Sequence, residues 1–308
     1  MNKIALIIPT LNGGPRWQEA LQAIDSQTLQ PDRKLVIDSG SDDATADLAR
    51  QQGFEVITIT RQQFNHGATR QQGADHVADC DILVYLTQDA VLDTPDALQQ
   101  LVSQFANPHI GAAYGRQLPH TDAGPFGSHA RQFNYPAQSR VKSIADAGEL
   151  GIKTPFLSNS FAAYRRAALQ QAGGFPTNVI LAEDMIAAAR MLQQGWHIAY
   201  VAEAAARHSH DYTLLEEFRR YFDTGVLHTR EPWLLQAFGT AEKSGGGFVR
   251  SELAYLRQHA FWLIPQAMAR NALKYAGYRL GKAEARLPRA LKPHLSMHKR
   301  YWQTHTHA

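Results

Sequence analysis

Polar side chains follow the ends of several short apolar segments of this chain. They are Thr10, Asn12, Asp38, Gln88 and Asp89. A single carboxylate at such a position suits a divalent cation that bridges a diphosphate, because Mg²⁺ takes one or two protein carboxylates together with phosphate oxygens and water. Asp89 is therefore a candidate metal ligand, and a turn or a helix cap is the alternative interpretation.

A pair of acids, Glu183 and Asp184, begins a segment with helical periodicity. A carboxylate at this position that faces a cleft can act as a general base and accept a proton from a hydroxyl group. The helix dipole also favours acids in a first turn. Spacing alone leaves both interpretations open.

Two histidines, His208 and His210, are separated by one residue in an extended segment. Side chains two residues apart in such a segment point to the same side, so the pair is able to bind a metal ion. The chain contains fourteen histidines, so a chance pair is the alternative.

A fourth group lies at the start of a predicted helix and comprises Asn65, His66 and Arg70. Backbone N–H groups and the dipole at a helix start favour anions, and Arg70 would add a charge one turn into the helix. An N-cap formed by Asn65 is the alternative.

Alternating strand and helix patterns must position these groups. Strands are predicted at residues 4–8, 34–38, 55–60 and 81–86, and helices at 17–27, 44–52, 67–78 and 95–105. This alternation predicts an α/β fold with a parallel sheet, in which ligands bind at the carboxyl ends of the strands. The polar residues named first lie at those ends.

Several classes of protein are excluded or disfavoured. The turn after the first strand, PTLNGGP, lacks the G-x-G-x-x-G of dinucleotide-binding folds, and no P-loop motif occurs. A single cysteine, Cys80, excludes a disulfide framework within the chain and a multi-cysteine zinc site. No signal-peptide pattern and no long apolar run is found, which predicts a cytoplasmic protein.

The C-terminal part has its own charge pattern. Residues 250–300 contain eleven Lys or Arg and two Glu, whereas the whole chain has a net charge of +3. A glycine-rich linker is predicted at residues 244–247, and an irregular functional loop at 117–155. We therefore expect a domain at 1–240 and a basic helical extension at 241–308, which serves in membrane association, as a dimer contact or as a solvated helical pair. No nucleic-acid-binding module accompanies the charge, so no nucleic acid is expected as a partner.

Four segments in this order resemble the family 2 glycosyltransferases of the GT-A fold, a Rossmann-like, mainly parallel sheet flanked by helices. They are IIPTLN at 7–12, IDSGSDDAT at 37–45, TQDA at 87–90 and AEDM at 182–185. A narrower resemblance, to the bacterial rhamnosyltransferase branch, is carried by FNHGATR at 64–70, HSHDYT at 208–213 and FRRYFDTGVLH at 218–228. The likeness extends from residue 1 to about residue 230.

The resemblance implies a role for each matching residue. Donor binding is implied for Pro9, Thr10, Asn12, Asp38, Asn65, His66, Arg70, Gln88 and Asp89. Asp89 would hold Mg²⁺ or Mn²⁺ with His208, and Asp184 would be the general base with Glu183 beside it. Gln88 replaces an aspartate that the family often has. Gln71 stands where the branch usually has asparagine, which puts a donor contact by residue 71 in doubt.

The function implied is inverting transfer of L-rhamnose from dTDP-L-rhamnose, which would give an α-L-rhamnoside. The acceptor would be lipid-linked or a lipopolysaccharide or other surface polysaccharide, at the cytoplasmic face of the inner membrane. Two alternatives remain open at this point. One is the same fold and mechanism with a UDP-hexose donor, and the other is a non-catalytic, membrane-associated glycan-binding or scaffold protein.

Overall fold

The computed structural model describes residues 2–239 and 242–304. Its centre is a nine-stranded sheet with the order β3-β2-β1-β4-β8-β6-β9-β5, and β7 also pairs with β9. The strands are β1 (Ile4–Thr10), β2 (Arg33–Asp38), β3 (Glu55–Thr58), β4 (Ile82–Leu86), β5 (Val91–Leu92), β6 (Ile110–Leu118), β7 (Arg140–Lys142), β8 (Phe161–Arg165) and β9 (His197–Arg207).

The sheet is parallel in its N-terminal half and mixed beyond it. Strands β3, β2, β1 and β4 are parallel neighbours, as the alternating pattern predicts. Strand β8 lies antiparallel between β4 and β6, and β6 and β9 are parallel to each other. The GT-A-like arrangement is confirmed, with a mixed sheet as its second half.

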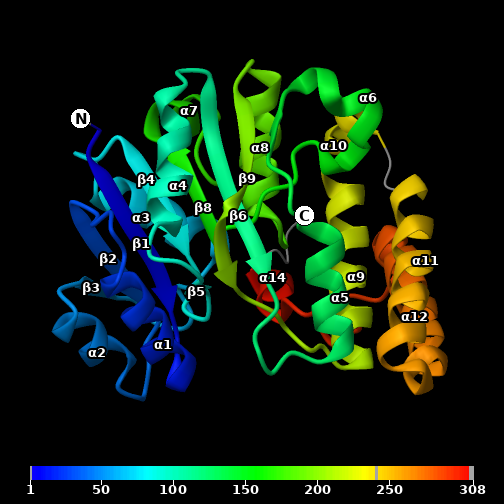
Figure 1. Cartoon of the computed structure of the whole chain (residues 1–308). Coiled ribbons are helices and arrows are strands. Elements are labelled where there is room, and N and C mark those ends of the chain that lie inside the picture. The colour runs from blue at the N-terminus through cyan, green and yellow to red at the C-terminus, as the bar shows by residue number, and fades with distance from the viewer. Residues whose placement is uncertain (1, 240–241, 305–308) are drawn as a thin grey trace.

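Helices cover both faces of this sheet (Figure 1). They are α1 (Gly14–Asp25), α2 (Thr45–Gln51), α3 (His66–His76), α4 (Ala97–Ser103), α5 (Pro125–Asn134), α6 (Ala147–Leu150), α7 (Arg166–Gln171), α8 (Glu183–Gln193), α9 (Leu214–Arg230), α10 (Pro232–Phe238), α11 (Glu242–His259), α12 (Ile264–Lys282), α13 (Lys292–Leu295) and α14 (Lys299–Thr304). Among the described residues, none of these helices is long and apolar enough to cross a membrane.

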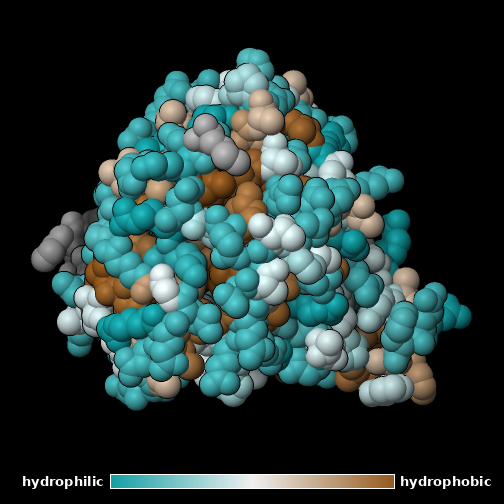
Figure 2. All heavy atoms as spheres, turned by 60° about the vertical axis from the view of Figure 1, so that its left-hand side comes forward, coloured by the Kyte–Doolittle hydropathy of each residue, from teal (hydrophilic) through white to brown (hydrophobic). Residues whose placement is uncertain are grey.

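The core has two layers, one on each face of the sheet. Side chains alternate along β1, so Ala5 and Ile7 join one buried cluster while Leu6 and Ile8 join the other. The first cluster includes α3, α7 and α8, and the second includes α1 and α4. On the face shown in Figure 2, hydrophilic residues dominate and hydrophobic ones show mainly in recesses.

The C-terminal helices pack on the rest of the chain. Figure 1 shows α11 and α12 side by side at one edge of the molecule, next to α5 and α9. Glycines allow α9 and α12 to approach closely, because a Cβ on Gly281 would lie 2.0 Å from the carbonyl oxygen of Phe222. The predicted division at residue 240 falls on residues 240 and 241, outside the described residues.

Two predictions about irregular segments are wrong. The segment 244–247 is not a linker, because α11 runs through it. Three glycines cost roughly 1 kcal/mol each in a helix, and the packing of the following turns of α11 against α5 offsets this cost. Residues 117–155 contain α5, β7 and α6. His129 and Phe133 of α5 pack on Phe248 of α11, a partner too distant in sequence for local periodicity to reveal.

Candidate active site

A cavity of about 560 Å³ lies where the central sheet meets the C-terminal helices. Its walls come from α3, α5, α8, α9, α11 and α12, and from the segments that follow β4 and β9. Asp89, Asp184 and His208, which are far apart in the sequence, all line it. The structure therefore brings the predicted metal ligands and the predicted base to one cavity.

Three side chains in this cavity form a candidate metal site. The Oδ2 atom of Asp89 lies 3.5 Å from Nε2 of His208 and 3.8 Å from Nε2 of His210. One ligand atom from each residue lies within 4.8 Å of the others. The family resemblance implies Asp89 and His208 as metal ligands but does not include His210. The two-residue spacing of His210 from His208 is the sequence feature that indicates it.

A glutamine from β6 orients the first histidine of this site. Nδ1 of His208 lies 3.0 Å from Oε1 of Gln117, whose Nε2 donates to Ser158 at 2.8 Å. An Nδ1–H that donates to Gln117 leaves the Nε2 lone pair directed toward Asp89, which is how outer partners orient metal-binding imidazoles. Burial lowers the pKa of His208 to about 3, so the ring is neutral at neutral pH and able to bind a cation.

The carboxylate of this site is ionised. Burial raises the pKa of Asp89, but His208, His210 and hydrogen bonds to the carboxylate together lower it by more, and the net direction is downward. One carboxylate and two imidazoles fit a divalent transition metal such as Mn²⁺ better than Mg²⁺, which prefers oxygen ligands.

Asp184 lies in the first turn of α8 and faces the same cavity. Its Oδ2 accepts a hydrogen bond from the backbone N–H of Asn159 at 3.0 Å, and its Oδ1 accepts one from that of Met185 at 2.8 Å. Burial and the nearby charge of Glu183 raise the pKa of Asp184 to about 6. A base with a pKa near the working pH is both ionised and able to hold a proton.

The neighbouring acid has a different environment. Glu183 forms a buried ion pair with Arg70, with 2.8 Å between Oε1 and Nη1, and also accepts a hydrogen bond from Asn159. Burial raises the pKa of Glu183, but Arg70, His66 and the hydrogen bonds to its carboxylate together lower it by more, so its net shift is downward. Ala182, just before this pair, has a left-handed backbone with φ of 62°, a conformation that costs energy for a residue other than glycine and is concentrated at functional sites.

The remaining predicted donor residues are not among the residues that line the cavity, and lie in a hydrogen-bonded loop at the strand ends. Asp38 accepts from the hydroxyls of Thr10 and Ser41 and from the backbone N–H of Gly40 and Ser41. Asn12 has φ of 48° and accepts from the backbone of Asp42. Pro9 pairs with Ile37 within the sheet. These carboxylate and amide oxygens therefore fix the shape of the loop.

Gln88 braces the same loop through both ends of its amide. Its Oε1 accepts from the N–H of Leu11 at 2.7 Å and its Nε2 donates to the carbonyl of Leu11 at 3.0 Å. An aspartate at position 88 has no N–H to donate. The replacement of the family's aspartate thus has a structural reason, and among the described residues the metal cluster draws its carboxylate from Asp89 alone.

The segment before α3 divides into a cap and a cavity wall. Asn65 is the N-cap, with Oδ1 accepting from the N–H of Ala68 at 2.9 Å, so the capping interpretation is confirmed. His66 lines the cavity and meets His298 edge-on at 5.5 Å between ring centres. His298 was not predicted from the sequence, because it reaches the site from the far end of the chain.

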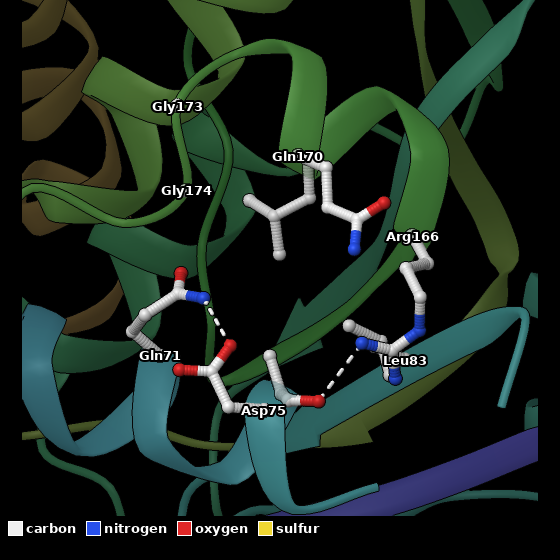
Figure 3. Close-up of a pocket in the computed structure, with 9 residues that line it drawn as sticks. Gln71, Asp75, Leu83, Arg166, Gln170, Gly173 and Gly174 are labelled. Atoms are coloured by element: carbon white, nitrogen blue, oxygen red, sulfur yellow. Dashed lines mark hydrogen bonds between the residues drawn. The ribbon is translucent and has the colours of Figure 1, made fainter. Parts of the chain in front are cut away.

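Gln71 is directed into a separate small cavity of about 210 Å³ (Figure 3). Its Nε2 donates to Asp75 at 2.8 Å and its Oε1 accepts from the N–H of Phe175 at 3.0 Å. The residues of this small cavity are distinct from those of the cavity that holds Asp89 and Asp184. Gln71 therefore holds α3 against the segment after α7.

Comparison with known proteins shows the family of this chain. Residues 5–173 match Glycosyl transferase family 2. The chain belongs to this family. It is 50% identical to the O-antigen chain rhamnosyltransferase RfbN of Salmonella typhimurium, over 97% of this chain and 96% of that protein. It is 46% identical to the O-antigen chain rhamnosyltransferase WbaN of Salmonella anatum, over 98% of this chain and 96% of that protein.

Solved structures support the same fold. The mannosyltransferase PcManGT from Pyrobaculum calidifontis, in complex with GDP-Man and Mn²⁺, superposes with a TM-score of 0.58 at 21% identity, covering 98% of this chain and 85% of that one. TarS 1–349 of S. aureus, in complex with UDP-GlcNAc, superposes with a TM-score of 0.53 at 15% identity, covering 92% and 91%. The family 2 chain is thus a glycosyltransferase, and the enzyme class and fold predicted from the sequence are confirmed.

Proposed function

We propose that this family 2 glycosyltransferase is an inverting, metal-assisted rhamnosyltransferase of O-antigen synthesis. It transfers L-rhamnose from dTDP-L-rhamnose to a lipid-linked or lipopolysaccharide acceptor. Two relatives that match nearly the whole chain at 50% and 46% identity carry the name O-antigen chain rhamnosyltransferase, which supports the sugar and the pathway. The observation that carries the mechanism is the single cavity shared by Asp184 and the cluster of Asp89, His208 and His210.

In the proposed direct displacement, each group has its own role. Asp184 accepts the proton of the acceptor hydroxyl while the oxygen of that hydroxyl attacks the anomeric carbon of the donor. The bond from this carbon to the diphosphate oxygen breaks at the same time. Asp89, His208 and His210 would hold a divalent cation, which neutralises the charge of the leaving nucleoside diphosphate. Mn²⁺ is proposed over Mg²⁺ because two of the three ligands are imidazoles. Glu183, fixed by Arg70, holds the start of α8 in place.

The proposal places the nucleotide at the strand-end loop built by Thr10, Asn12 and Asp38. Pro9, Gln88 and Asn65 shape its surroundings, and His66 and Arg70 face the sugar side of the cavity. Support comes from the position of this loop at the carboxyl ends of β1, β2 and β4, where ligands of parallel sheets bind.

Donor and metal are tested together by transfer assays with purified protein. We would supply dTDP-rhamnose or a UDP-hexose, with Mn²⁺, Mg²⁺ or EDTA, and a membrane extract that contains acceptor. Transfer from dTDP-rhamnose that needs Mn²⁺ and is lost in Asp89→Ala is the expected result. Transfer from a UDP-hexose alone would replace the rhamnose assignment while keeping the mechanism, and full activity in EDTA would refute the role of the cation.

Contact with the cytoplasmic face of the inner membrane is a further part of the proposal. In the middle of α12, Arg270 and Lys274 point inward and pair with the buried Glu217 at 3.1 and 3.4 Å. The outward face of the same turns, from residue 268 to 276, is apolar, with Met268 and Tyr275 65% and 62% exposed. This is the reverse of the usual pattern of a surface helix.

The surface beside α12 matches an anionic lipid layer. Phe261 and Trp262, just before the helix, are 67% and 65% exposed. Arg279 and Lys282 at the end of α12 are also exposed. Aromatic side chains beside basic ones are typical of helices that lie in a membrane interface. We assign this surface to the bilayer in preference to a second copy, since its exposed charges are of one sign.

Vesicle sedimentation tests this contact. Replacement of Phe261 and Trp262 by serine should weaken binding to vesicles with 30% phosphatidylglycerol by about tenfold or more, because each ring contributes roughly 2 kcal/mol when buried in lipid. Val141→Ser, a change at an apolar residue that is 49% exposed in β7, is the matched control. Equal binding by the double variant and the control would refute the assignment, and a dimer that the double variant loses would favour the second copy.

A further inference from the structure

Most charged groups of the cavity have a partner among the described residues, and Asp184 is held by two backbone N–H groups. Arg70 pairs with Glu183, while Arg270 and Lys274 pair with Glu217. Glu252 accepts a hydrogen bond from Asn271, and Asp89 lies between two histidines. Among the described residues that line the cavity, this leaves two guanidinium groups without a carboxylate, those of Arg131 and Arg220.

Arg131 is the more deeply placed of the two. Its Nε is shielded from solvent and has no hydrogen-bond partner within the described chain, and its guanidinium lies 5.9 Å from the ring centre of Tyr135. Burial lowers the pKa of Arg131. Burial of a cation without a counter-ion costs free energy. An anionic group of a bound ligand beside Arg131 would offset this cost.

Arg220 lies on α9 at the edge of the same cavity and is held next to the metal cluster. Its Nη1 donates to the hydroxyl of Tyr212 at 3.2 Å, and the ring of Tyr212 lies 5.5 Å from that of His210. Arg131 lines the same cavity as Asp89 and His208. Both arginines thus share one cavity with the site of the candidate cation.

A sugar does not need these two charges, because its hydroxyl groups are neutral. A diphosphate does, since it carries at least two negative charges and its oxygens match the planar fork of a guanidinium. A single carboxylate would balance only one of the two arginines. The surroundings therefore favour a diphosphate ester over a neutral glycan at this point of the cavity.

We propose that Arg131 and Arg220 form a diphosphate clamp beside the Asp89–His208–His210 cluster. The proposal rests on the proposed function in so far as that function supplies two diphosphates. One is the nucleoside diphosphate of the donor. The other is the diphosphate of a lipid carrier, whose tail would fit an apolar groove of about 640 Å³ that adjoins the cavity and is lined by Leu214, Leu215 and Leu263.

The first experiment measures the clamp without the sugar. Isothermal titration of the full chain with inorganic pyrophosphate, in EDTA, separates the arginines from the cation. We expect Arg131→Gln to weaken binding at least tenfold and Arg220→Gln to weaken it severalfold. Arg219→Gln is the matched control, because it removes the same charge one residue away, where the guanidinium donates to the carbonyl of His294 outside the cavity. Equal binding of pyrophosphate by all four proteins would overturn the clamp.

The second experiment identifies the source of the diphosphate. Steady-state rates are measured against donor and against a prenyl-diphosphate-linked acceptor for Arg131→Gln, Arg131→Lys and Arg220→Gln. A raised KM for the donor assigns the clamp to the nucleoside diphosphate, and a raised KM for the acceptor assigns it to the lipid carrier. Arg131→Lys should recover part of the loss, since it keeps the charge and loses the fork. Unchanged KM values for both substrates would refute the clamp.

The two proposals fail in different ways. Weaker pyrophosphate binding in Arg131→Gln, with no rhamnose transfer by the unaltered enzyme, would keep the clamp and remove the donor assignment. If the enzyme transfers rhamnose and Arg131→Gln binds pyrophosphate as tightly as the unaltered chain, the donor assignment would stand and the clamp would be refuted. Should Arg131→Gln fail to fold by circular dichroism, Arg220→Gln still tests the clamp, because its side chain is exposed at the cavity edge.

Discussion

The raised pKa of Asp184 predicts that the proposed base destabilises the fold it belongs to. Its pKa is about 6 in the folded chain against an ordinary value of 3.8, a difference of about two units, and each unit corresponds to ~1.4 kcal/mol. The folded state therefore disfavours the ionised carboxylate by roughly 3 kcal/mol. This is an upper value, because the carboxylate keeps some exposure to cavity water.

The effect of Asp184 on folding stability at each pH follows from the direction of its pKa shift. A carboxyl group whose pKa is raised on folding binds its proton more tightly in the folded state, so it costs stability above pH 6 and progressively less as the pH falls toward 3.8. Asp184→Asn removes the charge and this cost. It also leaves one of the two backbone donors, those of Asn159 and Met185, without an acceptor, which costs about 1 kcal/mol.

We expect Asp184→Asn to be more stable than the unaltered chain by about 2 kcal/mol at pH 8 and by about half of that or less at pH 5. Urea unfolding at both pH values measures this. The same change should lower kcat by a factor of roughly 10² to 10⁴, the usual contribution of a general base. Equal stability at pH 8, or a gain that does not depend on pH, would refute the assigned environment, and retained kcat would refute the role as base.

Three other outcomes are expected. The rate kcat/KM should rise with pH and level off above about pH 6, as Asp184 loses its proton, and a profile without this inflection would contradict the assignment. Gly281→Ala should destabilise the chain by about 1 to 3 kcal/mol, because the new Cβ meets the α9 backbone. Gly148→Ala is the control and should not destabilise the chain, because open space surrounds that position, and thermal unfolding measures both variants. Gln117→Leu should weaken Mn²⁺ binding by about 10- to 100-fold in a calorimetric titration. Gln117→Glu keeps the acceptor for His208 and should bind Mn²⁺ as the unaltered chain does. Equal Mn²⁺ affinities of Gln117→Leu and the unaltered chain would show that Gln117 does not orient the His208 ring.

Most of the N-terminal half of the fold is predictable from local patterns. Strands such as 34–38 and 81–86 are continuous apolar runs, and the helices between them end at recognisable caps, so alternation alone predicts the parallel sheet that β1 to β4 form. Strands β8 and β9 escaped this reasoning. They are rich in alanine, and only the packing of neighbouring strands makes such segments extended.

The candidate site also has a part that is predictable from the sequence and a part that is not. Asp89, Asp184 and His208 are recognisable from the sequence, since their types and motif positions indicate chemistry wherever the chain places them. The spacing of His208 and His210 indicates a candidate metal-binding pair. Sequence does not reveal that Gln117 orients His208, because this contact joins β6 to the segment after β9.

Tertiary structure also decides what each charge does. Glu183 and Asp184 are neighbours in sequence with the same charge, yet the pKa of one is lowered and that of the other is raised, because only Glu183 meets Arg70. The basic C-terminal segment is visible in the composition. That α12 turns Arg270 inward and Met268 outward is not, since the direction of a side chain depends on the helices it packs against. Sequence determines which chemical groups are present, and packing determines their partners and hence their charge and role.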